Sequence, residues 1–444
     1  MDGAVLEGKF EPASYAGRLS LPPLRVGVLV DLSLTSDAGG HVKCWERIAE
    51  AATGLHDRLD LTVHFNGSAK SPGLQRIELS PSVRYVLLPP VLSTSRLVRQ
   101  IPDHTDLAPW HPRLARMLSE YDVIHTTDAF FCYARTATRF SRRYGVPVVS
   151  SIHTNTPEYA RITVDHLLGR WLGKGFAYRL TSRGLDLPGM VSRRLQRRLQ
   201  RHLRQVSMAM ASYGETAAGK PAEWHCGVSL RRGLDRALFN PQRRDRAWLE
   251  TRFGLPPGQF IAMYAGKLNT GKNVQLLGPA VAEARRAGLP VHLLCPGKGD
   301  LHDSLMEKLG GAVTLPGVLA QDELAHALAS ADLFLFPSTI DESGNAAVEA
   351  LAAGLPALLA CGSGVAVRMA GCPAVRVLPG DDASAWAKAI VTLAAEPARC
   401  RELGRAARAY IETEVPSWEE VVVEDLLPVW REAAAARRPN GHRH

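Results

Sequence analysis

"FIAMYAGKLNTGKN", residues 260–273, carries the pattern that best predicts the fold of this chain. The apolar run 260–266 is typical of a buried strand, the glycines mark a turn, and a helical pattern follows. Part of the stretch, GKLNTGKN, matches the G-x-x-x-x-G-K of a phosphate-binding P-loop. The next residue is Asn273, however, where magnesium coordination by a P-loop requires Ser or Thr. A P-loop NTPase therefore remains only as a lesser alternative.

The same unit of strand, turn and helix recurs on both sides of this stretch. Further strands are expected at 291–297, 313–317, 331–338 and 355–360, and in the first half at 24–30, 60–67, 121–128 and 146–157. Strands that alternate with helices form parallel sheets covered on both faces. The sequence thus predicts an α/β protein with two doubly wound, Rossmann-like domains facing a central cleft. Ligands of such sheets bind at the carboxyl ends of the strands.

A Pro/Arg-rich stretch, RRGLDRALFNPQRRD (residues 231–245), separates the two patterns. We expect a lead-in over residues 1–23, an N-terminal domain over 24–215 and a C-terminal domain over 216–415. The tail 416–444 is expected to form a helix that packs back across the N-terminal domain.

The composition limits the classes of protein that fit. The chain has 444 residues, 46% apolar and 22% charged, with a formal net charge of +9. No apolar run reaches the length of a spanning helix, and the first 23 residues lack the features of a signal peptide. The seven cysteines form no CxxC pair and no Cys/His cluster. We therefore expect a cytoplasmic protein without structural zinc or a disulfide framework. The sequence also contains no D-x-D pair, so we expect no metal, and no cofactor is expected either.

Positive charge is concentrated in one segment. Residues 161–210 contain eleven Arg or Lys and two Asp, which accounts for the whole excess. A nucleic-acid-binding protein would spread its charge differently, so no nucleic acid is expected as a partner. Within the segment, residues 191–206 place Val191, Leu195, Leu199 and Leu203 four apart among six arginines. This helix is either a solvated surface or a peripheral contact with an anionic membrane on its inner face.

The stretch DESGNAAVEALAAGLP (residues 341–356) places two carboxylates eight positions apart. Taken with GKLNTGKN, with VTLPGVLAQDELAHALASADLFLFPS (residues 313–338) and with RRGLDRALFNP, it resembles the C-terminal domain of the retaining GT-B glycosyltransferases of family 4. That family reads G-R-x-x-x-x-K-N, then A-D-x-F-x-F-P-S, then an E-x7-E segment. The resemblance is specific over residues 225–415 and looser over 24–215, where AGGHV, YDVIH and VPVVSSIHT carry it.

The resemblance implies a nucleotide-sugar site on the C-terminal domain. Glu349 would bind the donor ribose, and Asp341 would contact hydroxyls of the transferred sugar. Lys272 matches the family lysine and Lys267 stands where the family has Arg, so both would stabilise the departing diphosphate. A helix beginning near Asn345, which can cap it, offers free N–H groups to the same diphosphate. Those groups belong to the turn and first residues of the helix, Gly344, Asn345 and Ala346.

The N-terminal domain would hold the acceptor. Gly39 and Gly40 would let the backbone approach the donor diphosphate closely. His153, Thr154 and Asp128 would contact the acceptor or the reacting sugar, although His125 is an open alternative to His153.

The expected activity is therefore metal-independent, retaining transfer of a hexosyl group from a UDP- or GDP-linked sugar. The acceptor is unidentified, and a lipid or glycolipid at the membrane surface is one expectation. Three departures, Lys267 in place of Arg, Asp341 in place of the first family Glu and Ser343 in place of a Phe, leave open a non-catalytic relative that acts as a partner or scaffold subunit.

Overall fold

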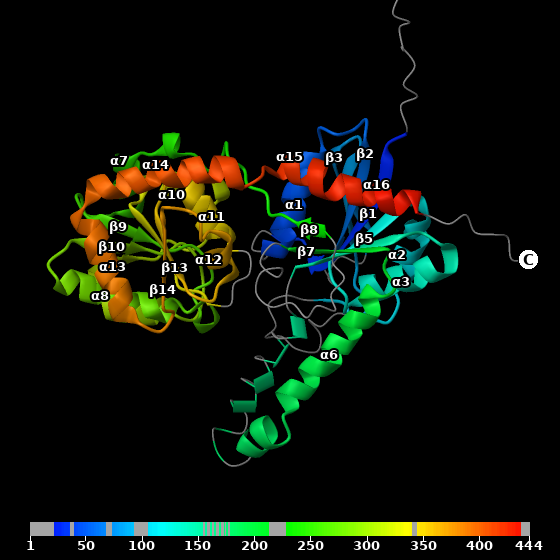
Figure 1. Cartoon of the computed structure of the whole chain (residues 1–444), viewed down its shortest axis with the longest axis horizontal. Coiled ribbons are helices and arrows are strands. Elements are labelled where there is room, and N and C mark those ends of the chain that lie inside the picture. The colour runs from blue at the N-terminus through cyan, green and yellow to red at the C-terminus, as the bar shows by residue number, and fades with distance from the viewer. Residues whose placement is uncertain are drawn as a thin grey trace, which may run out of the picture.

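The computed structural model describes residues 22–35, 40–67, 73–92, 105–153, 178–212, 228–339 and 344–436, with scattered positions between 154 and 177. Figure 1 shows two α/β domains side by side, each with a central sheet and helices around it. One sheet has eight strands and the other six, and all neighbouring strands are parallel except one pair. The predicted fold class is confirmed.

The N-terminal sheet has the strand order β3-β4-β2-β1-β5-β6-β7-β8, with β3 antiparallel to β4. Two helices, α1 and α3, cover its opposite faces: α1 packs with Val28 and Leu61, and α3 packs with Leu29 and Ile124. The strands are β1 (Leu24–Ser33), β2 (Leu59–Asn66), β3 (Gln75–Ser80), β4 (Val83–Leu88), β5 (Val123–Thr126), β6 (Val148–Ile152), β7 (Met208–Ser212) and β8 (Val228–Leu230). The helices are α1 (Gly40–Ala52), α2 (Pro112–Met117), α3 (Cys132–Tyr144) and α6 (Leu187–Leu203).

The C-terminal sheet is parallel throughout, in the order β11-β10-β9-β12-β13-β14. Its inner strands β9, β10, β12 and β13 are short, apolar and buried on both faces, as parallel strands between two helical layers must be, whereas β14 at the edge exposes Arg376 and Val377. The strands are β9 (Phe260–Met263), β10 (Val291–Leu294), β11 (Val313–Thr314), β12 (Leu333–Phe336), β13 (Ala357–Ala360) and β14 (Val375–Leu378). The helices are α7 (Arg246–Phe253), α8 (Leu277–Arg286), α9 (His302–Leu309), α10 (Gln321–Ser330), α11 (Asn345–Ala352), α12 (Gly364–Arg368), α13 (Ala383–Ala395) and α14 (Pro397–Glu414).

The end of the described chain returns to the N-terminal domain. After α14, the short α15 (Trp418–Glu420), a π-helical turn (Val421–Leu426) and α16 (Leu427–Ala435) run along that domain (Figure 1). Trp430 is fully buried in the same core as β1 and β2. Asp425 accepts hydrogen bonds from the backbone N–H and guanidinium of Arg231, at 2.7–3.2 Å. These contacts attach residues 421–433 to the N-terminal domain.

Two segments connect the domains and lie against each other. Leu234 donates its backbone N–H to the carbonyl of Pro416 at 2.9 Å and forms a parallel bridge with Ser417. A Cβ on Gly233 would lie 2.7 Å from the Cα of Trp418, so only glycine allows this approach. We call residues 231–236 and 415–418 the hinge.

Helix α6 extends away from the rest of the N-terminal domain (Figure 1). Asp186 caps it by accepting the N–H of Gly189. Leu199 is buried beside Phe130 and Ile152, so the later part of the helix rests on the domain. In the part of the chain that the structure describes, no helix has the length and apolarity needed to span a bilayer.

Candidate active site

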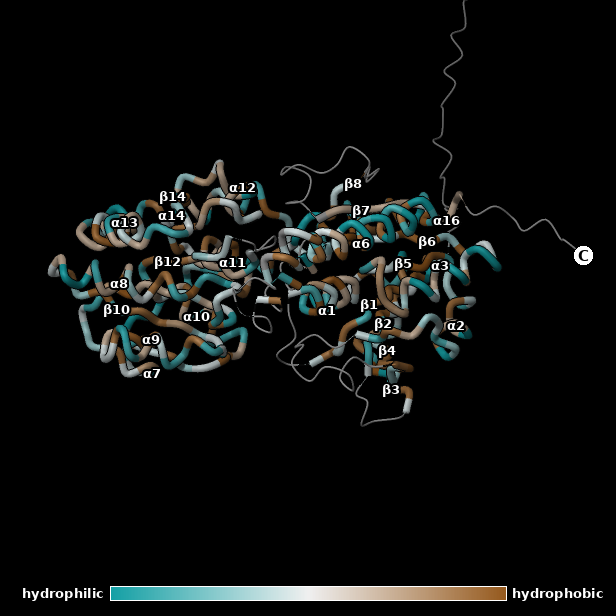
Figure 2. Tube along the Cα trace, turned by 90° about the horizontal axis from the view of Figure 1, so that it is seen from below, coloured by the Kyte–Doolittle hydropathy of each residue, from teal (hydrophilic) through white to brown (hydrophobic). Residues whose placement is uncertain are grey.

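The N-termini of α1 and α11 meet between the two domains. A Cβ built on Gly40, the first residue of α1, would lie 3.4 Å from Nδ2 of Asn345, the first residue of α11. Figure 2 also shows α1 and α11 on the facing sides of their domains. The N–H groups of a first helical turn have no intrahelical acceptor, and the helix dipole adds positive potential there. Two such ends therefore face one space at the carboxyl edges of both sheets.

The turn before α11 requires glycine. Gly344 has φ +52° and is the N-cap of the helix, whereas the sequence predicted Asn345 in that role. A Cβ on Gly344 would lie 2.3 Å from Cβ of Val365. A left-handed residue in this crowded position leaves no room for a side chain. The prediction relied on the common role of asparagine side chains as helix caps. It was wrong because the left-handed backbone of Gly344 places that residue at the N-cap and makes Asn345 the first residue of the helix.

Glu349 lies one turn inside α11 and is half-buried. Burial raises the pKa of Glu349 to about 7, and the positive charge of Arg47 on α1 acts in the opposite direction. Arg47 is itself paired with Glu50 at 2.6 Å. The electrostatic link between Glu349 and α1 crosses from one domain to the other.

Lys267 and Lys272 lie in the turn that follows β9. Asn273 has φ +56°, and its amide donates to the carbonyls of Pro337 at 3.1 Å and Gly380 at 2.6 Å. The same turn therefore lies beside the segment that follows β12 and leads to α11. The Asn273 amide is used to hold the turn, and residues 270–272 form a 3-10 turn in place of the start of a P-loop helix. This geometry does not favour the P-loop alternative.

Two histidines of the N-terminal domain, His125 and His153, belong to a buried hydrogen-bonded chain that runs through Ser151. Trp430 donates its indole N–H to His125 Nδ1 at 2.9 Å, so a neutral His125 carries its proton on Nε2 and donates to Ser151 at 2.8 Å. Arg232 donates to His153 Nδ1 at 3.1 Å, so a neutral His153 likewise donates from Nε2 to Ser151, at 2.7 Å. These tautomers follow because indole and guanidinium groups are only donors.

These hydrogen bonds change how His125 and His153, the two candidate site histidines, are interpreted. His125 is fully buried, and its hydrogen-bond partners are Ser151 and Trp430, so it is a core residue. His153 ends β6 at the predicted edge, but protein partners occupy both of its ring nitrogens. Its ring stacks on His41 of α1, with centroids 4.4 Å apart. Sequence reasoning missed His41, although it directly follows the predicted Gly39 and Gly40.

Asp128 lies at the same edge as His153 and holds the turn that precedes α3, whose N-cap is Phe131. One of its oxygens accepts the N–H groups of Phe130 and Phe131, at 2.7 and 2.9 Å. The sequence did not point to its neighbour Asp31, where burial and then the charge of Asp128 raise the pKa to about 8. Asp31 accepts hydrogen bonds from Asn66, from the Asp106 N–H and from the Tyr133 N–H. Both carboxylates therefore have structural partners.

Three predicted site residues, Gly39, Thr154 and Asp341, lie outside the described residues. Within the described ranges, no group of three or more His, Cys, Asp or Glu is arranged to hold a metal ion.

Comparisons with known proteins show to which family the chain belongs. The fold is that of the GT-B glycosyltransferases. The family model "Glycosyl transferases group 1" matches residues 259–396, and "Glycosyltransferase Family 4" matches residues 45–208. The chain therefore belongs to the group 1 glycosyltransferases and is a glycosyltransferase, as the sequence predicted.

Relatives cover nearly the whole chain. A D-inositol 3-phosphate glycosyltransferase of Streptomyces avermitilis is 26% identical over 432 residues, which is 91% of this chain and 88% of that protein. Among solved structures, a sucrose-phosphate synthase from Thermosynechococcus elongatus has a TM-score of 0.67 at 19% identity, over 93% of this chain and 100% of its own. Anabaena HepE in complex with UDP and glucose has a TM-score of 0.62 at 15% identity, with the same coverage. At these identities the structural likeness shows the fold alone.

Proposed function

We propose that this glycosyltransferase is a metal-independent, retaining enzyme that moves a hexosyl group from a UDP- or GDP-linked sugar to an acceptor held by the N-terminal domain. One observation carries the proposal. The N-termini of α1 and α11 face each other at Gly40 and Asn345, with Glu349 one turn inside. A diphosphate between them would receive N–H groups from both sides.

The chemistry follows from where charge develops. Breaking the bond between the sugar and the diphosphate leaves growing negative charge on the diphosphate oxygens. Helix N–H groups and the ammonium groups of Lys267 and Lys272 would stabilise that charge, so no metal is required. Glu349 would accept hydrogen bonds from the ribose hydroxyls, and Asp341 would contact the transferred sugar.

Two further findings support the proposal, and the first concerns the nucleotide-sugar donor. The solved HepE complexes contain UDP, UDP with glucose, or UDP-glucose. Two relatives that match 91% of the chain are named D-inositol 3-phosphate glycosyltransferases, which supports glycosyl transfer itself.

The test is direct. The protein is offered UDP- and GDP-linked hexoses with a cell extract as acceptor source, with and without EDTA, and the products are identified by mass spectrometry. We expect a hexose mass increment that EDTA does not abolish, with an unchanged anomeric configuration. Stabilisation by UDP or GDP without any transfer would instead favour the non-catalytic relative.

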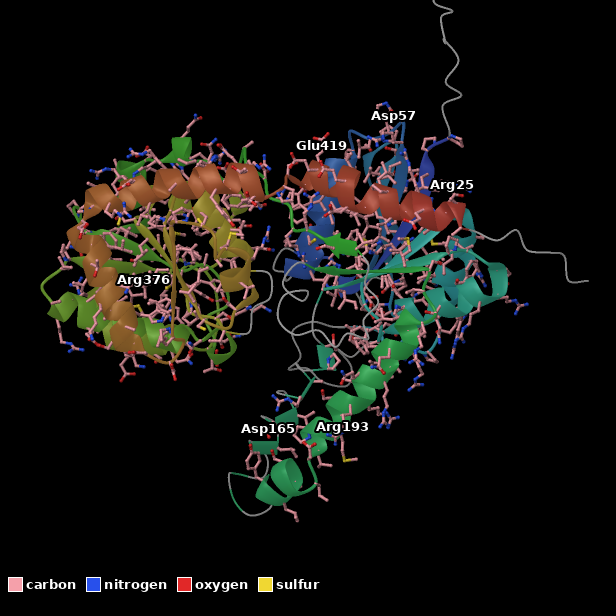
Figure 3. All side chains as sticks on the ribbon, in the orientation of Figure 1. Arg25, Asp57, Asp165, Arg193, Arg376 and Glu419 are labelled. Carbon is pink, nitrogen blue, oxygen red and sulfur yellow. The ribbon has the colours of Figure 1, made fainter. Side chains whose placement is uncertain are left out.

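We further propose that α6 contacts an anionic membrane that carries the acceptor. Leu180, Leu185 and Met190 lie at the start of the helix and before it, and their exposed fractions are 49%, 56% and 54%. Arginines follow along the helix, as Figure 3 shows for Arg193. Apolar groups beside a run of cations fit a surface of anionic lipid, where each Arg adds about 1 kcal/mol.

Sedimentation with vesicles tests this contact. We expect binding to phosphatidylglycerol vesicles and none to phosphatidylcholine, with loss at high salt. The double variant Arg194→Gln/Arg197→Gln should bind roughly tenfold more weakly or worse. The variant Leu185→Asp should also weaken binding, whereas Val318→Asp, at a 58% exposed position on the other domain, should not. Equal binding by all of these variants would refute the membrane contact.

A further inference from the structure

The Arg232 side chain lies buried at the hinge. It follows β8 and is 6% exposed. Its Nη2 donates to His153 Nδ1 at 3.1 Å, and its backbone carbonyl accepts from Arg368 of α12 at 3.0 Å. The residue therefore contacts the histidine at the end of β6 and also the C-terminal domain.

This guanidinium lacks a counterion within the described part of the chain. Its Nε and Nη1 are buried and have no oxygen or nitrogen hydrogen-bond partner there. The Cys44 thiol, a weak acceptor, is hydrogen-bonded to the guanidinium, and no described carboxylate forms an ion pair with it. An arginine does not lose its proton in a protein, so the positive charge persists. Burying an unpaired charge is costly, and buried polar groups are normally paired.

The neighbouring groups cannot supply the missing negative charge. The Cys44 thiol lies beside Arg232, but burial raises the pKa of Cys44 despite that cation, so the thiol stays neutral. Burial lowers the pKa of His41 to about 3, and Arg232 lowers it further. His153 is neutral for the same reasons. The cluster therefore holds one fixed positive charge and two neutral rings.

The cluster also extends to the space between α1 and α11. His41 stacks on His153, and its Nε2 is buried without a partner in the described residues. Its chain neighbour Gly40 faces Asn345 across the domain boundary. Unpaired nitrogen groups of His41 and Arg232 thus belong to one cluster at the substrate cleft.

We infer that Arg232, with His41 beside it, forms an anion site that takes a phosphate group of a substrate. The inference rests on the proposed function for the origin of that phosphate, which is either the donor diphosphate or a phosphate on the acceptor. The free groups are shielded from solvent in this arrangement, so the anion enters while the domains are apart.

Calorimetric titration tests the inference. The probes are inorganic phosphate, UDP, GDP and the matching nucleosides, and the proteins are the wild type, Arg232→Gln and Arg232→Lys. The control is Arg376→Gln, an exposed arginine on the C-terminal domain that Figure 3 labels. We expect Arg232→Gln to bind phosphate or nucleoside diphosphate about 10- to 100-fold more weakly, the effect of losing charge-assisted hydrogen bonds. Nucleoside affinity should not change, and Arg232→Lys should recover part of the loss.

Competition between phosphate and nucleotide in the titration distinguishes the two origins of the bound phosphate, the donor diphosphate and the acceptor. Phosphate that competes with UDP or GDP identifies the donor diphosphate, and phosphate that binds beside a saturating nucleotide identifies the acceptor. Unchanged anion affinity in a folded Arg232→Gln would overturn the inference, whether or not the wild type transfers a sugar. Should that variant not fold, the Arg232 Nε–H resonance of the wild type must shift on addition of phosphate, and an unchanged resonance refutes the site. A protein that binds phosphate through Arg232 but transfers no sugar would refute only the proposed function.

Discussion

Replacing Glu349 by Gln should stabilise the free protein and weaken nucleotide binding. The structure gives the size of the first effect. Burial raises the pKa of Glu349 from 4.5 to about 7. At about 1.4 kcal/mol per pKa unit, ionising this carboxyl in the folded protein costs about 3 kcal/mol. This figure is a ceiling, since Glu349 is half-buried and water screens part of its charge.

The sign of the pH dependence follows from the two protonation states. Below pH 4.5 the carboxyl is protonated in both the folded and the unfolded chain, so Glu and Gln should differ little. As pH rises to about 7, the unfolded chain loses the proton first, and the wild type loses stability relative to Glu349→Gln. Above pH 7 the gap between the two proteins should be constant.

The assay is urea unfolding of both proteins from pH 4.5 to 8.5, with Glu307→Gln, at an exposed position of α9, as the control. Calorimetry at pH 8 then measures UDP and GDP affinity, which should fall roughly 10- to 100-fold, as expected when a charged acceptor of two hydroxyls is lost. A stability gap that is the same at pH 5 and pH 8 would refute the buried-charge argument. Unchanged nucleotide affinity would refute the role in ribose recognition.

Three other substitutions probe the site and the fold. Lys272→Ala should lower kcat by about 10²–10³ if its charge stabilises the leaving group, and an unchanged rate would exclude that role. Gly344→Ala should lower the melting temperature, because the new Cβ would lie 2.3 Å from Val365 at a φ of +52°; a wild-type melting curve would contradict the geometry. Asp425→Asn removes the carboxylate that Arg231 holds and should cost roughly 2–3 kcal/mol in urea unfolding. A smaller loss would mean that the other contacts of this segment, such as the buried Trp430, hold α16 without the Arg231–Asp425 pair.

The sequence predicted those parts of the fold whose signals are local. Strands such as β9 and β12 are short apolar runs that end in glycine or proline, and each was predicted at its observed place. The strands β3, β4, β7, β8 and β14 were not predicted. β4 and β14 are valine-rich runs whose local pattern was overlooked, whereas β3 and β7 lack such a pattern. The side chains of β3 are nearly all exposed at the sheet edge, and β7 consists of Met, Ala and Ser without β-branched residues. Their strand conformation comes from pairing with neighbours, which a local pattern does not contain.

The candidate site likewise contains residues that the sequence predicted and contacts that it could not predict. Gly40, Gly344 and Glu349 belong to stretches whose order resembles a family, and the structure gives them a shared location. The partners of His153 could not be predicted, because Arg232 lies 79 residues away along the chain. Likewise, the hydrogen bond from Trp430 to His125 joins residues 305 positions apart. Such pairs have no sequence spacing that identifies them.

The hinge explains why these distant residues belong together. Arg232 uses its side chain to hold His153 and its backbone carbonyl to hold Arg368 of the other domain. Next to it, Gly233 allows the second connection to pack closely at Trp418. A change in the angle between the domains must therefore move the guanidinium relative to α11, because the same residue contacts both domains. Binding of an anion at Arg232 would then favour one domain arrangement over others, since a ligand stabilises the conformation to which it binds more tightly.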